Sequence, residues 1–272
     1  MKKNFIIYAL IMIVTVSYVW AEDMNIVATE FSPYICNPEK EGGKEGFVID
    51  IFKAVFEVHG YKVKVENQPW IRTIKTFNDN TGKFDGLLAA TKIHPINKET
   101  SVFPDTEICV YSHKFYALSD SPLVGTWKYN GLESLKNIKL GGIKGWSYSS
   151  AEITKYVNET PEPRVSLMYG EDLLRRNIQM LLKKRTDLYV ENQCMVEYFL
   201  FNEIKAGIKD AEKIVAVDSV PIDEGVADSY PVFYKKRDGQ KYADIFSNGM
   251  KELRSSGKLE SIMAKYGLKD WR

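Results

Sequence analysis

The sequence predicts an α/β protein with mainly parallel sheets, divided into two lobes. Short apolar or alternating runs take turns with stretches in which apolar residues recur at helical spacing, and this order occurs twice along the chain. Without its N-terminal leader the chain keeps 251 of its 272 residues, close to the ~250 residues at which single hydrophobic cores tend to split. The repeated order and the length together favour two α/β units over one.

The N-terminal leader, residues 1–21, is predicted to be a secretory signal peptide. Lys2 and Lys3 precede an apolar run over residues 5–16, and Ala21 suits the position before a cut. A retained membrane anchor is the alternative, but the run is short for a bilayer span, which needs about 20 apolar residues. No other segment is apolar enough to cross a membrane, and no cysteine near the cut can take a lipid. We expect a soluble, exported protein.

The charge balance disfavours nucleic acid and anionic membranes as partners. The chain has 37 basic and 36 acidic residues, and removal of the two leader lysines leaves 35 against 36. A surface for such partners would need a basic excess. We therefore expect no nucleic-acid partner.

Three cysteines, Cys36, Cys109 and Cys194, remain in the mature chain. An exported protein folds in an oxidising compartment, where three cysteines form at most one intramolecular disulfide. Cys36 and Cys109 both follow predicted strands of the first lobe, so we expect them to form the pair.

The first lobe begins with alternating residues 24–29, which predict a strand that ends in the aromatic turn 30–34. Two aromatic side chains in that turn can line a ligand. Apolar residues at helical spacing predict a helix over residues 48–56, and the alternation around residues 63–65 predicts a second strand.

Trp70 directly follows Pro69 at the end of this second strand, and residues 70–77 suit a helix with Arg72 on another face. A tryptophan in this place can offer a flat ring to a ligand or to a cation. An ordinary core tryptophan is the alternative.

Residues 84–90 form an almost wholly apolar run that predicts a buried central strand. A polar loop with Lys92, His94 and Asn97 follows, and in open α/β sheets ligands bind just beyond the carboxyl ends of strands. This loop is therefore a candidate binding surface, with a solvated surface loop as the alternative.

The second lobe repeats the order of strand and helix before the chain returns. The expected elements are strands over residues 109–119, 139–143, 164–167 and 186–190, a helix over 171–184, a last strand over 231–235, and two helices over 245–253 and 259–266. The strand over 186–190 delivers Glu191 and Asn192 to its carboxyl end.

Ser149 and Glu152 have the S-x-x-E spacing of a capping box, which predicts a helix start. The backbone N–H groups near Ser147 and Tyr148 would then lie at a helix N-terminus, which attracts a carboxylate or phosphate. The capping box marks a helix start whether or not a ligand binds there.

Taken together, these features resemble the family 3 periplasmic solute-binding proteins, the receptors of polar amino acid ABC importers, over residues 24–267. Six motifs in order carry the resemblance: Glu30-Phe31-Ser32-Pro33-Tyr34, Gly46-Phe47-Val48-Ile49-Asp50, Gly82-Lys83-Phe84-Asp85 with Pro95 and Phe103, Lys144-Gly145-Trp146-Ser147, Arg185-Thr186-Asp187, and residues 250–259. The motif Pro69-Trp70-Ile71-Arg72 is similar to a branch of the family with poorly defined ligands.

The resemblance implies a two-lobed periplasmic-binding-protein fold of type II with the ligand between the lobes. Lobe one would hold residues 22–112 plus 230–272, and lobe two residues 113–229. Two hinge crossings would lie near residues 109–115 and 225–232, so that closure buries the solute from both sides. The resemblance also implies a periplasmic location.

The resemblance places ligand contacts on the residues that match those of the family: Phe31, Trp70, Ala90, Lys92, Asn97, Ile143, Trp146, Ser147, Tyr148 and Asn192. Asn97 stands where the family has an arginine for the ligand α-carboxylate, and Asn192 stands where it has an aspartate for the α-ammonium. Because charge-assisted bonds are the strong ones in a desolvated cleft, a zwitterionic α-amino acid held in the usual way is not expected. Tyr34, Arg72 and Glu191 complete the candidate site, with Lys92 or Arg72 as a replacement positive centre.

We therefore expect a small polar or anionic solute, stacked on Trp70 and Phe31 and anchored by Lys92 and the helix start at Ser147. The protein would act as a monomer and serve an inner-membrane ABC permease. A ligand-sensing receptor without transport is an open alternative.

A dehydratase-like enzyme of the same fold is the second alternative. Glu191 and Glu30 would then be the acid/base candidates, but His59, His94 and His113 lie far apart, without metal-ligand spacing. No nucleophile, phosphate-binding or dinucleotide motif occurs. We expect neither an enzyme nor a cofactor or metal site.

Overall fold

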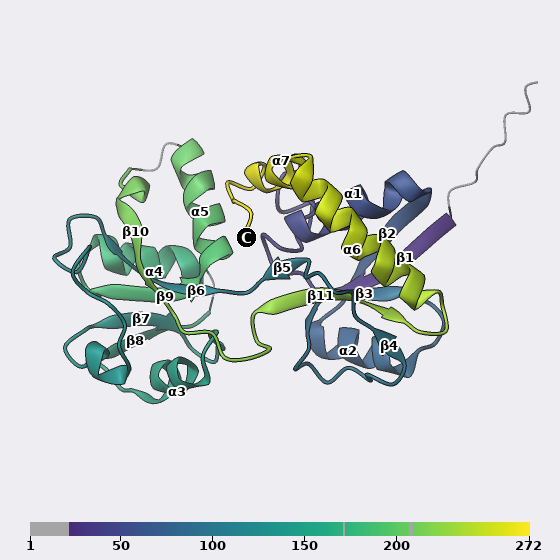
Figure 1. Cartoon of the computed structure of the whole chain (residues 1–272). Helices are drawn as coiled ribbons and strands as arrows, with labels where there is room; N and C mark the ends of the chain where they lie inside the picture. Colours follow the sequence, from purple (N-terminus) through teal and green to yellow (C-terminus); the bar gives the residue numbers. More distant parts are fainter. Residues whose placement is uncertain (1–21, 171, 207–208) are drawn as a thin grey trace, which may run out of the picture.

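The computed structural model describes residues 22–170, 172–206 and 209–272, so the predicted signal peptide lies outside the described residues. Two β-sheets, each flanked by helices, form two halves that two segments of chain connect (Figure 1). The expected two-lobed α/β fold is confirmed. In the described part of the chain, no helix has both the length and the apolar character that a bilayer crossing requires.

The first sheet combines the N-terminal strands with one strand from near the C-terminus. Its strands are β1 (Glu22–Ala28), β2 (Tyr61–Asn67), β3 (Gly86–Thr91), β4 (Ser101–Val102), β5 (Cys109–Val110) and β11 (Asp228–Tyr234). The order is β2-β1-β3-β11-β4, with β5 beside β11. Every residue of β3 is buried, which confirms the predicted central strand.

Helices cover both faces of this first sheet. They are α1 (Phe47–Phe56), α2 (Trp70–Asp79), α6 (Gly239–Ser255) and α7 (Lys258–Ala264). In Figure 1, α1 and α6 lie on one side of the sheet and α2 lies on the other. The start of α2 thereby places Trp70 next to the carboxyl ends of the parallel strands.

The second sheet has the order β10-β6-β9-β7-β8. Its strands are β6 (His113–Leu118), β7 (Leu140–Ile143), β8 (Val165–Met168), β9 (Leu188–Asn192) and β10 (Ile214–Ser219), and its helices are α3 (Ala151–Glu159), α4 (Leu173–Leu182) and α5 (Gln193–Lys205). Short 3₁₀ turns lie at Glu57–His59, Leu132–Leu135 and Ala211–Lys213. Sequence patterns did not predict α5 or β10.

Both sheets are mixed rather than mainly parallel. In the second sheet β7 pairs in parallel with β8 and β9, whereas β6 runs antiparallel to β9 and β10. In the first, β1 pairs in parallel with β2 and β3, whereas β11 runs antiparallel to β3. The chain enters or leaves a half through the antiparallel strands β6, β10 and β11. The periodicity of a sequence does not show in which direction a strand runs.

The single strand predicted over residues 109–119 is two strands, β5 in the first sheet and β6 in the second. The chain changes sheet at residues 111–112 and returns over residues 220–227, and the two crossings are bonded to each other. The Tyr111 N–H donates to the Ala227 carbonyl at 2.9 Å, and the Val220 N–H donates to the His113 carbonyl at 2.9 Å. Both pieces are extended, so their alternation looked like one strand.

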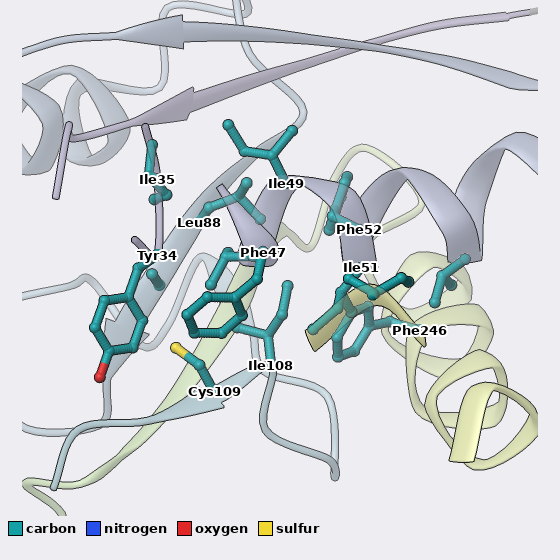
Figure 2. Close-up of a cluster of buried hydrophobic side chains, with 14 of the residues drawn as sticks. Tyr34, Ile35, Phe47, Ile49, Ile51, Phe52, Leu88, Ile108, Cys109 and Phe246 are labelled. Carbon is teal, nitrogen blue, oxygen red and sulfur yellow. The ribbon is translucent and has the colours of Figure 1, made fainter. Parts of the chain in front are cut away.

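The core of the first half forms where α1 and α6 pack against each other and against the same face of the sheet. Phe47 and Phe52 of α1 are buried among Leu88 of β3 and Phe246 of α6, and Figure 2 shows these side chains converging. Tyr34 lies beside Phe47, with ring centroids 4.9 Å apart. The aromatic turn that was predicted to line a ligand is therefore anchored in the core.

The three cysteines are free thiols, so the expected Cys36–Cys109 disulfide is not formed. Both residues are buried in the first core but have different polar neighbours. Ser32 lies beside Cys36, whereas Ser229 and Tyr111 lie beside Cys109. Burial raises the pKa of Cys36 to about 11, and it also raises the pKa of Cys109, so both thiols stay protonated at neutral pH.

Candidate functional site

A cavity of about 390 Å³ lies between the two halves, a volume within the usual range of small-molecule sites. The lining residues come from both halves and from both crossings: Thr29, Glu30, Phe31, Ile35, Trp70, Leu88, Ala89, His94, Tyr111, His113, Trp146, Ser147, Tyr148, Ser149, Asn192 and Val226. The cavity lies at the carboxyl end of β3, where ligands of open α/β sheets bind.

Aromatic side chains dominate this lining. Phe31 of the first half lies against Trp146 of the second, with ring centroids 6.4 Å apart, and against Tyr111 of the first crossing at 6.0 Å. Such rings offer large apolar faces with few polar atoms. Both halves and a crossing therefore contribute aromatic side chains to the cavity wall.

Six of the twelve predicted site residues line this cavity: Phe31, Trp70, Trp146, Ser147, Tyr148 and Asn192. The other six do not belong to the lining: Tyr34, Arg72, Ala90, Lys92, Asn97 and Glu191. Of the lining residues, the sequence patterns had not singled out Tyr111, His113 or Ser149 as ligand contacts.

The expected positive centre is not part of the lining. The Lys92 Nζ lies 4.7 Å from the centre of the Tyr230 ring, where the cation contacts an aromatic face of the protein itself. Arg72 is exposed on α2, and Asn97 is exposed and accepts a bond from the Glu99 N–H through Oδ1. Local sequence could place these residues near a strand end but could not show where their side chains point.

The predicted capping box at Ser149 is not formed. Helix α3 begins at Ala151, so Ser150 is at the N-cap position, but the Ser150 side chain makes no capping hydrogen bond. The Ser149 Oγ lies 2.7 Å from the His113 Nδ1 instead. The Ala151 N–H donates to Asp223 Oδ2 at 2.7 Å, so a carboxylate of the protein itself binds at the start of α3. The Tyr148 N–H donates to Thr154 Oγ1 at 2.9 Å.

Replacement of Asp223 by alanine is expected to lower the free energy of unfolding by about 1 kcal/mol, because the first N–H of α3 loses its acceptor. Asp223→Asn keeps an oxygen in the same place and is expected to retain most of that stability. Urea denaturation of the two variants measures the difference. Equal stability of the alanine variant and the wild type would contradict the capping role.

Two histidines, one from each half, line the cavity. The His94 Nδ1 accepts from the Thr91 N–H at 3.0 Å, and the His113 Nδ1 accepts from the Ser149 N–H at 3.1 Å. Burial lowers the pKa of both rings, that of His113 to about 4. Both imidazoles are therefore neutral at pH 7. The residues lie in different halves, so sequence spacing gave no sign of their shared site.

Asn192 links the two halves beneath the cavity. Its Oδ1 accepts from the Tyr34 hydroxyl at 3.0 Å and from the Met195 N–H at 3.1 Å. Tyr34 thus lies behind the cavity and holds Asn192, which caps the start of α5. The cap fixes the Asn192 amide at the cavity wall.

Glu191 lies behind the cavity as well and is fully buried. It accepts from the Tyr189 hydroxyl at 2.6 Å and from the Asn192 N–H at 2.8 Å. Burial, opposed by these two bonds, raises its pKa to about 7. With both oxygens engaged, the carboxyl group is not placed to exchange protons with a bound solute. Glu30, the other acid/base candidate, does line the cavity, and its carboxylate is paired with the Lys40 Nζ at 3.1 Å.

The described residues contain no group of three or more histidine, cysteine or acidic side chains that could hold a metal ion. The polar groups of the lining are hydroxyls, two indole N–H groups, an amide, two neutral imidazoles and the Glu30 carboxylate. This arrangement is suited to holding a solute by stacking and hydrogen bonds.

Comparisons with known proteins agree with the geometry. The bacterial extracellular solute-binding proteins, family 3, match residues 25–269. A relative from Neisseria gonorrhoeae named "Probable histidine-binding protein" is 20% identical over 242 residues, which are 89% of this chain and 81% of that protein.

Solved structures show the same fold. A polar amino acid ABC uptake transporter substrate-binding protein from Streptococcus thermophilus has a TM-score of 0.66 at 18% identity, over 93% of this chain and 89% of its own. The L-cystine solute receptor of Neisseria gonorrhoeae, in its unliganded open conformation, has a TM-score of 0.64 at 16% identity, over 93% of this chain and 96% of its own. Because the family match covers nearly all the described residues, this chain belongs to the bacterial extracellular solute-binding proteins of family 3.

Proposed function

We propose that the protein captures a small polar solute in the cavity between its halves and delivers it to an ABC importer from the periplasm. The observation that carries this proposal is the lining, to which both halves and both crossings contribute. The relatives named for histidine, for L-cystine and for polar amino acids support a solute of similar size. The protein would act as a monomer.

Capture is proposed to work by closure of one lobe on the other. Residues 22–112 with 230–272 would form one lobe and residues 113–229 the other. The crossings at residues 111–112 and 220–227 would absorb the motion. Phe31, Trp70, Trp146 and Tyr148 would stack on the solute, and Ser147 and Asn192 would supply polar contacts.

Alanine variants of Trp70 and Trp146 test the proposed stacking contacts, one from each lobe. Mass spectrometry of natively purified protein identifies a co-purified solute, and titration calorimetry then measures its affinity for each variant. Each variant is expected to bind about tenfold more weakly or worse, because a buried aromatic side chain contributes roughly 1.5–3 kcal/mol.

Ile71→Ala is the matched control, since Ile71 follows Trp70 on α2 and is 85% exposed. It is expected to bind like the wild type. If the Trp146 variant also bound like the wild type, capture between two lobes would be ruled out. Chemical turnover of the solute would show an enzyme instead.

A further inference from the structure

The polar groups of the cavity indicate a class of solute, and this inference rests on the proposed function above. His94 lies on the first half, where its ring centroid is 4.6 Å from that of Trp70 in an edge-on arrangement. Its Nδ1 accepts from the Thr91 N–H at 3.0 Å. A ring nitrogen that accepts carries no proton, so the proton of this neutral imidazole is on Nε2.

His113 repeats this arrangement on the second half. Its ring centroid lies 5.3 Å from that of Tyr148, again edge-on. Its Nδ1 accepts from the Ser149 N–H at 3.1 Å, so its proton is also on Nε2. Burial lowers the pKa of this ring to about 4, which keeps it neutral at physiological pH. Each half therefore supplies one aromatic side chain paired with one neutral N–H donor.

These donors are available to a solute. Among the described residues, neither Nε2 of His94 nor Nε2 of His113 has a hydrogen-bond partner, although both rings line the cavity. The Asn192 amide also offers a hydrogen-bond donor, because its oxygen already accepts from the Tyr34 hydroxyl and the Met195 N–H. Its NH₂ group is the part that remains for a solute. A bound solute would thus meet donors from both sides.

The charges around the cavity disfavour an anionic solute. Of the residues that the structure describes, no lysine or arginine belongs to the lining, and its one acidic side chain, Glu30, is paired with Lys40. A solute carboxylate would lose its hydration here without gaining a cation, which is unfavourable in a desolvated site. A neutral solute avoids this penalty.

We propose that the cavity selects a neutral, flat solute rich in hydrogen-bond acceptors, of the class of oxo-substituted heterocycles. Its carbonyl oxygens or ring nitrogens accept from Nε2–H of His94 and of His113. Its ring lies among Phe31, Trp70 and Trp146. The two histidines are thereby the specificity-determining residues of the cleft.

Paired substitutions separate the donor from the rest of each ring. His94→Asn and His113→Asn keep an acceptor near the position of Nδ1 and remove the donor, whereas His94→Gln and His113→Gln place an amide nitrogen near the position of Nε2. Calorimetry with uracil and hypoxanthine is compared with L-histidine, L-glutamine and L-cystine. Each asparagine variant is expected to weaken heterocycle binding by about tenfold or more. Its Tm without ligand stays near that of the wild type, and each glutamine variant recovers most of the affinity.

Three results would overturn this assignment. The first is heterocycle binding that the asparagine variants leave unchanged. The second is binding of the amino acids alone, unaffected by those variants, which would leave the proposed function intact. The third is no binding of any of the five probes, after which the co-purified solute and the tryptophan variants decide the proposed function separately.

Discussion

Replacement of Gly46 by alanine is expected to destabilise the protein by about 3 kcal/mol or more, through backbone strain and overpacking together. Gly46 has a φ of +103° and precedes α1. A Cβ at this position would overlap the Tyr34 carbonyl oxygen and lie 2.7 Å from the Cys36 nitrogen. These are backbone atoms of the aromatic turn and of the residues directly after it, which cannot move aside without displacing Phe31 from the cavity.

Gly43→Ala is the matched control for the Gly46 prediction. Gly43 has a φ of +87°, but apart from its chain neighbours no atom of the described residues lies within 4 Å of a Cβ built there. The Gly43→Ala variant reports the conformational strain without the steric overlap. We expect this strain to cost about 1 kcal/mol. Urea denaturation of both variants gives the two free energies. Equal losses would show that close approach of the turn is not what requires glycine at position 46.

Replacement of Glu191 by glutamine is expected to stabilise the protein at pH 8 by about 3 kcal/mol, from the pKa shift of this fully buried carboxyl. Folding raises its pKa from 4.5 to about 7 through burial. The glutamine amide can donate to the Tyr189 oxygen and accept from the Asn192 N–H, so the two hydrogen bonds are kept.

The pH dependence of this effect has a definite sign. A carboxyl group whose pKa is raised by folding contributes stability that is complete below pH 4.5 and is lost as the pH rises through 7. The advantage of Glu191→Gln should therefore grow from near zero at pH 4.5 to its full value at pH 8. His113, with its lowered pKa, acts in the opposite direction, but it does so in both proteins and cancels from their difference.

Denaturation at several pH values measures this difference. The exposed Glu99→Gln is the control for the loss of a carboxylate, and it is expected to show a flat difference across the same range. A flat difference for Glu191→Gln would mean that its carboxyl titrates normally in the folded protein.

Several features could be predicted from the sequence because local pattern decides them. The almost wholly apolar run before Thr91 predicts a strand buried on both faces, and the Pro69-Trp70 step predicts a helix start beside a strand end. Ordered motifs then gave the family, and with it the cavity positions of Phe31 and Trp146. The positions of these residues are set by strands and helices that the periodicity of apolar residues predicts.

The amino-acid order thus determined the two α/β lobes and the aromatic part of the cleft. Tertiary structure decided how most polar groups of the cleft are bonded, because many of their partners come from distant segments. His113 meets Ser149, Asp223 reaches the start of α3, and Tyr34 bonds Asn192 across 158 positions. A hydrogen bond is specified by atoms within about 3 Å and a suitable angle, and only the packing of the two halves brings those atoms together.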